Sequence, residues 1–300
     1  MNKKIQSVLL LILATAIWGT TFVAQSVGMA HIGPFTFQAV RCALGGIILL
    51  PIIAVADRFK KDNKTFLLRW ADKQLWLGGF LCSIPLFLAC NLQQLGLVDT
   101  DAGKSAFLTA MYIVIVPIIG VFRRKMPSPL IPVSLVFAVA GLYCLCGVGM
   151  SGLALGDLLL LGCALAFAIQ ITFIDIFAPQ TDALRLNAIQ SILCAVFSSI
   201  VMFATEQPKW TQLSDCWLPL CYAGFLSMGI AYSLQIIGQK NLEPSSASLI
   251  MSLESVFAVL SGCLILHETM TLWEILGCVL IFGSVILSQI PLKHKSKSRG

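Results

Sequence analysis

Hydrophobic residues in this chain fall into ten long runs, and Pro, Gly or charged residues separate one run from the next. The runs cover residues 6–27, 35–56, 74–94, 103–122, 129–148, 156–177, 186–205, 215–237, 245–266 and 272–290. Each run is close to the ~20 residues that an α-helix needs to cross a hydrocarbon layer about 30 Å thick. The pattern therefore predicts an all-α membrane protein with ten transmembrane helices.

The composition agrees with this prediction, and the basic residues give it an orientation. Hydrophobic residues make up 58% of the chain and charged residues only 11%, whereas soluble domains carry about 25% charged residues. If the N-terminus lies inside, seventeen Lys and Arg residues lie on the inner side, Lys104 and Lys209 lie outside, and Arg41 lies within a helix. This bias predicts cytoplasmic N- and C-termini and explains the net charge of +6 without a nucleic-acid partner.

Two features at first suggest other classes of protein. The start of the chain resembles a signal peptide, but its apolar run extends to Val27, which favours a retained first helix. Nearly all of the eleven cysteines lie within apolar runs, and none forms a Cys-x-x-Cys pair. We therefore expect them to act as small buried hydrophobic residues, with no metal site and no cofactor.

The chain contains an internal repeat. The segment 92–96, Leu-Gln-Gln-Leu-Gly, is echoed by Leu-Gln-Ile-Ile-Gly at 234–238, and a weaker match 149 positions apart pairs Trp18 with Phe167 and Arg41 with Gln190. The halves are then residues 1–150 and 151–300, the second ending in a basic cytoplasmic tail. Because each half has five helices, the second half enters the membrane upside down. Many secondary transporters with alternating access are built from such inverted repeats.

Several short motifs resemble those of the drug/metabolite transporter superfamily, in particular the ten-helix EamA-type exporters. They are Ile17-Trp18-Gly19-Thr20-Thr21-Phe22, Gly33-Pro34-Phe35 with Arg41, the segment 107–112 with Pro117, and Leu253-Glu254-Ser255-Val256-Phe257-Ala258 with His267-Glu268. The resemblance covers the whole chain. Ser255 stands where the family usually has proline, which argues against a kink in the ninth helix.

This resemblance implies a secondary transporter that exports small metabolites, often amino acids, across the bacterial inner membrane without nucleotide hydrolysis. The expected partners are a small-molecule substrate, the lipid bilayer, and a coupling proton or counter-substrate. Two alternatives stay open: uptake or exchange of a nucleotide-derived or sugar metabolite, and lipid flipping. An enzyme is disfavoured because no Ser/His/Asp, Cys/His or paired-carboxylate set shares a helix face.

Polar and aromatic residues inside the apolar runs are the candidates for substrate binding. Trp18 lies too deep for an interfacial residue, and Arg41 and Glu254 are charges within a span, where charge is costly and therefore marks function. Buried amides and tyrosine hydroxyls add hydrogen-bonding groups. The predicted substrate-binding residues are Trp18, Thr21, Gln38, Arg41, Gln94, Tyr112, Gln170, Gln190, Tyr232, Gln235 and Glu254.

Arg41 and Glu254 are each present in only one half of the repeat. Gln190 is the expected counterpart of Arg41, and Met111 that of Glu254. We expect the two charges to polarise the cavity, so that a substrate carrying both charges bridges them. If desolvation of Glu254 outweighs the effect of a nearby cation, Glu254 can also carry the coupling proton. The alternative is that Glu254 only ties helices together through hydrogen bonds.

Overall fold

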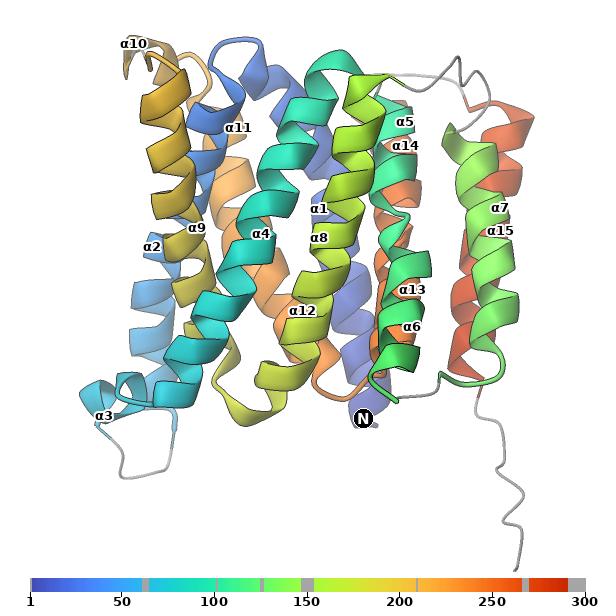
Figure 1. Cartoon of the computed structure of the whole chain (residues 1–300), viewed down its shortest axis with the longest axis horizontal. Coiled ribbons are helices and arrows are strands. Elements are labelled where there is room, and N and C mark those ends of the chain that lie inside the picture. Colours follow the sequence, from blue (N-terminus) through green and yellow to red (C-terminus); the bar gives the residue numbers. More distant parts are fainter. Residues whose placement is uncertain are drawn as a thin grey trace, which may run out of the picture.

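The computed structural model describes residues 2–60, 65–100, 102–124, 127–146, 154–208, 210–265 and 270–290. It consists of helices that run side by side across the molecule (Figure 1). The first half contains α1 (Lys3–Met29), α2 (Pro34–Arg58), α3 (Phe66–Trp70), α4 (Lys73–Asp99), α5 (Ala102–Thr109), α6 (Tyr112–Phe122) and α7 (Ile131–Cys146). The second half contains α8 (Leu155–Phe177), η1 (Ala178–Gln180), α9 (Ala183–Thr205), α10 (Trp210–Leu213), α11 (Trp217–Cys221), η2 (Tyr222–Ala231), α12 (Tyr232–Gln239), α13 (Pro244–Met251), α14 (Leu253–Ile265) and α15 (Leu272–Gln289).

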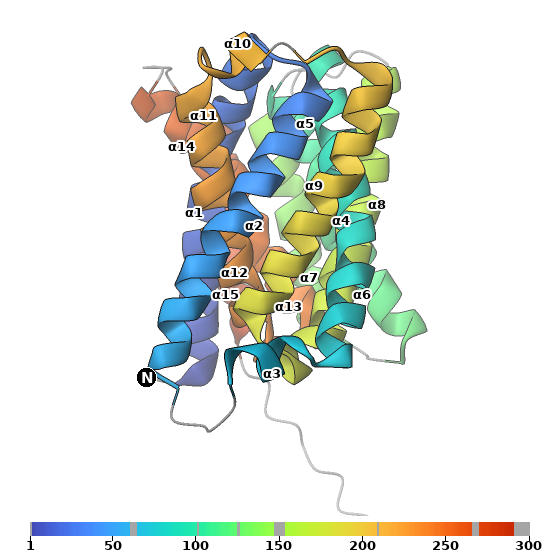
Figure 2. The same cartoon turned by 90° about the vertical axis from the view of Figure 1, so that its left-hand side faces the viewer.

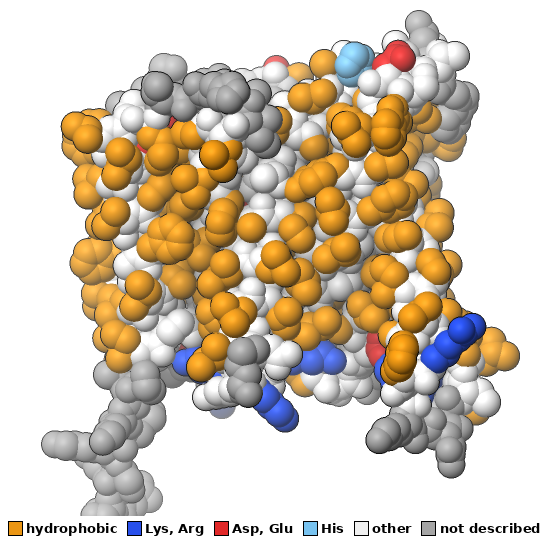
Figure 3. Space-filling model, turned by 180° about the vertical axis from the view of Figure 1, so that it is seen from behind, with side chains coloured by type: hydrophobic (Ala, Val, Ile, Leu, Met, Phe, Trp, Pro, Cys, Tyr) orange, Lys and Arg blue, Asp and Glu red, His pale blue; other side chains and the backbone are white. Residues whose placement is uncertain are grey.

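All ten predicted spans are present. Within the described residues nine helical stretches are long and apolar enough to cross a membrane, and the tenth, α7, is apolar but shorter. Apolar side chains cover the sides of the bundle, while Lys and Arg side chains gather at one end (Figure 3). We call this end, where α1 begins and α2 ends, the basic face, and the other end the far face. Seven of the seventeen basic residues expected there lie outside the described residues.

The two halves are inverted relative to each other. Helix α1 starts at the basic face, whereas its counterpart α8 starts at the far face (Figure 1). The contacts between helices follow the same symmetry. Helix α4 packs on α8, and the counterpart of α4, formed by η2 and α12, packs on α1. Likewise α6 packs on α8, and its counterpart α14 packs on α1. Helices α2 and α9 pack on each other, as do α7 and α15. The chain is therefore two inverted five-helix repeats, as predicted.

Two different offsets relate the repeats. Helices α1 and α2 match α8 and α9 at 149 positions, whereas α5 (Ala102–Thr109) matches α13 (Pro244–Met251) at 142. The difference arises in the connection after the second helix, where the first half inserts α3 across the basic face (Figures 1 and 2). At the offset of 142 the counterpart of Glu254 is Tyr112, so the pairing of Glu254 with Met111 was wrong.

The fourth and ninth spans are both broken in the middle. The break between α5 and α6 falls at Ala110 and Met111, and the break between α13 and α14 falls at Ser252. No proline causes either break. In the ninth span the hydroxyls of Ser248 and Ser252 donate to the carbonyls of Ser245 and Leu249, at 2.9 and 2.7 Å, and such back-bonding bends helices. The argument from Ser255 against a kink in this helix was therefore wrong.

Acidic residues join α2 to α9 at both ends. At the basic face Asp57, at the end of α2, forms a two-point ion pair with Arg185, at the start of α9. At the far face Glu206, after the end of α9, accepts hydrogen bonds from the backbone N–H groups of Phe35 and Thr36, both at 2.9 Å. Asp57 and Glu206 are repeat counterparts, 149 positions apart. The crossing of α2 and α9 is thus fixed at each face by equivalent residues.

Candidate functional site

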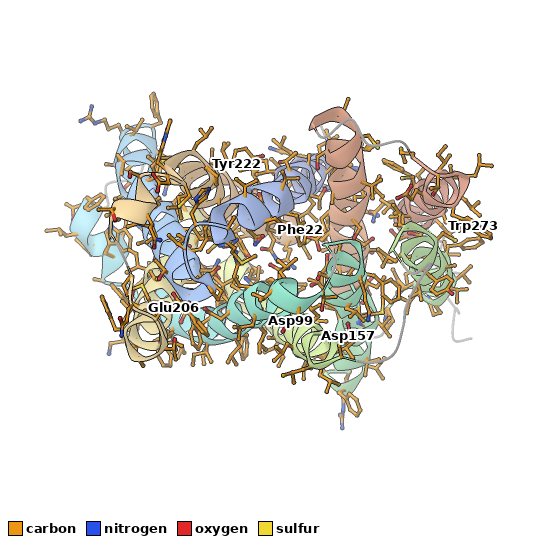
Figure 4. All side chains as sticks on the ribbon, turned by 90° about the horizontal axis from the view of Figure 1, so that it is seen from above. Phe22, Asp99, Asp157, Glu206, Tyr222 and Trp273 are labelled. Carbon is orange, nitrogen blue, oxygen red and sulfur yellow. The ribbon has the colours of Figure 1, made fainter. Side chains whose placement is uncertain are left out.

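A cavity lies in the middle of the bundle. Helices of both halves build its wall, which consists of Trp18, Thr21, Phe22, Gln25, Arg41, Gln93, Tyr112, Phe167, Ile171, Ser227, Tyr232, Gln235, Met251 and Glu254. Seen from the far face, the labelled Phe22 lies near the centre of the bundle, whereas Glu206 and Trp273 lie toward its edges (Figure 4).

Aromatic rings form much of the wall. Trp18 and Tyr232 meet edge to face with ring centroids 5.0 Å apart, and Tyr112 and Phe167 do so at 6.4 Å. Each contact joins the two halves of the chain. The adjacent Gly19 allows α1 to lie directly on α14, because a Cβ atom built there would be 2.6 Å from the Cβ of Phe257. The close packing of α1 thus holds Trp18 at the cavity.

The two charges predicted from the sequence lie in the same cavity. Arg41 is 3% exposed and Glu254 is 8% exposed. The Nη2 atom of Arg41 contacts the Sγ atom of Cys90 at 3.6 Å, but its Nε and Nη1 atoms have no hydrogen-bond partner. Tyr112 donates to Glu254 at 3.4 Å. Neither charge forms an ion pair within the described residues, so the cavity presents one cationic and one carboxylate group to a bound molecule.

The broken helices place Glu254 and Tyr112. Each residue lies at or near the start of the second segment of its span, Tyr112 at the start of α6 and Glu254 in the first turn of α14. Because the two spans are repeat counterparts, the breaks bring equivalent positions together near the pseudo-twofold axis. Discontinuous helices around a central site are typical of inverted-repeat transporters.

A π-helical segment, η2, brings Ser227 to the wall of the cavity. The side-chain amide of Asn187 donates to the carbonyls of Met228 and Gly229, at 2.9 and 3.0 Å, and to the hydroxyl of Ser233 at 2.9 Å. These bonds support the irregular backbone of η2 inside the bundle. π-Helical turns are rare and often occur at functional sites.

The whole length of the chain matches one family. The model of the EamA-like transporter family covers residues 5–147 and 154–289. This chain belongs to the EamA-like transporter family. The five-helix halves therefore correspond to two EamA units, and the protein is a membrane transporter and not an enzyme.

Known relatives agree with the family assignment. An uncharacterized transporter of Archaeoglobus fulgidus is 31% identical over 292 residues, covering 95% of this chain and 86% of that protein. The threonine/homoserine exporter RhtA of Escherichia coli is 26% identical over 304 residues, covering 97% and 93%. One solved crystal structure covers 94% of this chain and 96% of its own, with a TM-score of 0.77 at 18% identity, which shows a common fold.

In this EamA-like protein, seven of the eleven predicted binding residues line the cavity: Trp18, Thr21, Arg41, Tyr112, Tyr232, Gln235 and Glu254. The other four are buried amides outside its wall. Gln94 accepts from the cavity residue Gln25 at 3.2 Å, and Gln170 accepts from the cavity residue Gln235 at 3.5 Å. Gln190 accepts from Gln170 at 3.4 Å, and Gln38 donates to the sulfur of Cys42 at 3.0 Å.

Seven wall residues were not among the predicted ones: Phe22, Gln25, Gln93, Phe167, Ile171, Ser227 and Met251. The internal repeat could have found two of them. Phe167 is the repeat counterpart of Trp18, and Gln93 is that of Gln235 at the offset of 142. Gln25 is an amide within the first apolar run, so the signal used for the other amides could have found it. Phe22, Ile171, Ser227 and Met251 resemble the lipid-facing or helix-packing residues around them.

Proposed function

We propose that this protein exports a zwitterionic amino acid or a closely similar compound by alternating access. The observation that carries the proposal is the pair of unpaired buried charges in one cavity. The guanidinium group of Arg41 can donate to a carboxylate, and the carboxylate of Glu254 can accept from an ammonium group. A buried charge is stable only when it is paired. A zwitterion bound between the two residues would satisfy both.

The aromatic wall of the cavity and the relatives support the same class of substrate. The aromatic rings offer apolar surface to a side chain. A relative over nearly the whole chain bears the name threonine/homoserine exporter. For uptake or exchange of a nucleotide-derived or sugar metabolite, the described cavity offers a single cation and no second basic group for phosphates.

We infer that the basic face is cytoplasmic and that the protein lies in a bacterial inner membrane. The support is the collection of Lys and Arg at this end (Figure 3), which follows the positive-inside rule. Phe59 is 81% exposed there. In a background without native cysteines, a thiol introduced by Phe59→Cys should escape an impermeant reagent added to intact cells. Labelling of that thiol in intact cells would reverse the orientation.

The test of function is transport by purified protein in liposomes loaded with labelled threonine, a labelled nucleoside, a labelled sugar or a labelled phospholipid. We expect threonine or another zwitterionic amino acid to move. Arg41→Gln and Glu254→Gln should each lower the rate at least about tenfold, since each removes a charged partner worth ~2 kcal/mol or more. Movement of lipid alone would refute transport of a zwitterion.

Matched controls separate charge in the cavity from charge elsewhere. Arg58→Gln changes an exposed arginine of the same helix α2, and Asp215→Asn changes an exposed carboxylate outside the spans. Both variants should transport at the unaltered rate. If Glu254→Gln also transports normally and keeps the original pH dependence, Glu254 only holds helices together and carries neither substrate nor proton.

A further inference from the structure

The cavity wall is only partly symmetric. Four pairs of repeat counterparts line it together: Trp18 with Phe167, Phe22 with Ile171, Gln93 with Gln235, and Tyr112 with Glu254. The other wall residues are Ser227, Tyr232 and Met251 of the second half and Thr21, Gln25 and Arg41 of the first. Thr21, Gln25 and Arg41 lie on α1 and α2 between the middle of the bundle and the far face. The counterparts of Thr21, Gln25 and Arg41, which are Gln170, Ile174 and Gln190, lie on the basic side of the middle and do not line the cavity.

The counterparts on the basic side include a continuous chain of buried amides. Gln235, in the cavity wall, donates to Gln170 at 3.5 Å, Gln170 donates to Gln190 at 3.4 Å, and Gln190 donates to Asn187 at 2.9 Å. All four side chains are at most 2% exposed. The Oε1 atom of Gln235 has no partner in the protein. A polar track therefore begins at the cavity and leads toward the basic face.

The two ends of the cavity are closed by different chemistry. On the far side Gln25 donates to Gln94 at 3.2 Å, and the Nε2 atom of Gln94 has no partner. The repeat counterparts of these two residues are Ile174 and Ile236. Both isoleucines belong to an apolar cluster with Leu75 and Phe177 near the basic face. The far end of the cavity is thus closed by a contact between two amides, whereas packed apolar side chains close the end near the basic face.

We propose that the amide chain of Gln170 and Gln190 is the substrate-binding site of the conformation that opens to the basic face. In that conformation these two amides bind the polar groups of the substrate, in particular its carboxylate. Thr21 and Arg41 bind those groups in the present conformation. This inference rests on the proposed transport function. Inverted repeats reach the opposite-facing state by exchanging their packing around a fixed site, so residues that are hidden now take the positions their counterparts hold in this structure. Amide N–H groups can donate to a carboxylate as the guanidinium does.

The experiment locks the far side and measures exposure of the amide chain. The background lacks native cysteines and still transports, and Gln25→Cys with Gln94→Cys supplies an oxidisable pair where the two amides now touch. The reporter is Gln170→Cys, labelled from the basic face with an impermeant maleimide and quantified by peptide mass spectrometry. Oxidation of the lock excludes the state open to the far face, so the protein is left to exchange between the closed state seen here and the state open to the basic face. The labelling rate of the reporter should therefore rise at least about tenfold relative to the reduced protein.

A matched control lies two residues away on the same helix. Ala168 is fully buried in the main hydrophobic core, so a thiol introduced by Ala168→Cys should stay unreactive in both states. Ile174→Cys, one turn nearer the basic face, is a second reporter and should respond like Gln170→Cys. Reporters that stay inert in the locked protein, or that react no faster than the Ala168→Cys control, would overturn the proposal.

This result is independent of the identity of the substrate. The labelling measures exposure and needs no bound ligand. A failure to move amino acids in liposomes would refute the proposed substrate and leave the labelling result unchanged. Conversely, normal amino-acid transport with unresponsive reporters would refute only the proposed role of Gln170 and Gln190 and would leave the proposed substrate unchanged.

Discussion

Replacing Asp57 by Asn should destabilise the bundle, because it leaves a buried guanidinium group without its main partner. The side chain of Arg185 is 1% exposed and that of Asp57 is 12% exposed. The guanidinium also lies over the rings of Phe66 and Trp70, at 5.7 and 5.3 Å from their centroids. The pair therefore connects α2, α9 and the short helix α3 at the basic face (Figure 2).

The magnitude lies between two limits. Exposed ion pairs contribute about 0–1 kcal/mol, and breaking a fully buried pair costs about 3–5 kcal/mol. Asp57 lies at the edge of the bundle, and Arg185 has a second acidic neighbour, Asp182, at 3.4 Å. We therefore expect Asp57→Asn to lower the free energy of unfolding by about 2 kcal/mol. The measurement is equilibrium unfolding in mixed micelles with increasing SDS, followed by tryptophan fluorescence.

A second change tests the cause of this loss. Arg185→Met keeps apolar contact with the two rings but removes the buried charge, so the double variant should be less destabilised than the sum of the single variants. Asp215→Asn, an exposed carboxylate, should change stability by less than about 0.5 kcal/mol. The reasoning fails if Asp57→Asn behaves like this control, or if the two single effects add within about 0.5 kcal/mol.

Two further variants test the wall of the cavity and the charges of the basic face. Trp18→Ala should lower the initial transport rate at least about tenfold at equal protein level, whereas Trp217→Ala, a tryptophan that is 61% exposed, should change it by less than about twofold; equal rates would assign Trp18 to packing alone. Burial raises the pKa of Asp182, but hydrogen bonds from Lys60 and from the N–H of Arg185 outweigh this effect and hold the pKa below its ordinary value of 3.8. The stabilisation from Asp182 is therefore present above pH 3.8 and is lost as the pH falls through the lowered pKa. Asp182→Asn should weaken the dependence of the free energy of unfolding on acid pH. An unchanged dependence would contradict this role of Asp182.

The ten spans could be predicted because apolar length is a local property of the chain. The breaks could not, since Ala110 and Ser252 resemble their neighbours and neither break involves proline. Arg185 was expected among the basic residues of the inner side, and the structure places it at the basic face but buries its side chain. Its partner Asp57 lies 128 positions earlier in the chain, and no local pattern identifies a partner at that separation.

The site could be predicted where a residue type is unusual for its place in the membrane. Trp18, Arg41 and Glu254 stand out because a ring in mid-span or a charge in hydrocarbon needs a special environment. Ile171, Ser227 and Met251 are ordinary residues of apolar helices, and the direction each one faces depends on tertiary packing. The burial of the amides was predictable from the sequence. Which of them line the cavity and which only support its wall was not predictable.

The repeat also explains why one acid, and not two, lies at the centre of the cavity. Tyr112 and Glu254 are counterparts and lie in direct contact at 3.4 Å. Identical acidic halves would place two carboxylates side by side at this point, where each would oppose ionisation of the other. Such a pair shares one proton, so one of its carboxylates is held neutral. The tyrosine avoids this coupling and donates a hydrogen bond to the acid. The loss of exact symmetry at this pair thus leaves a single carboxylate at the centre of the cavity.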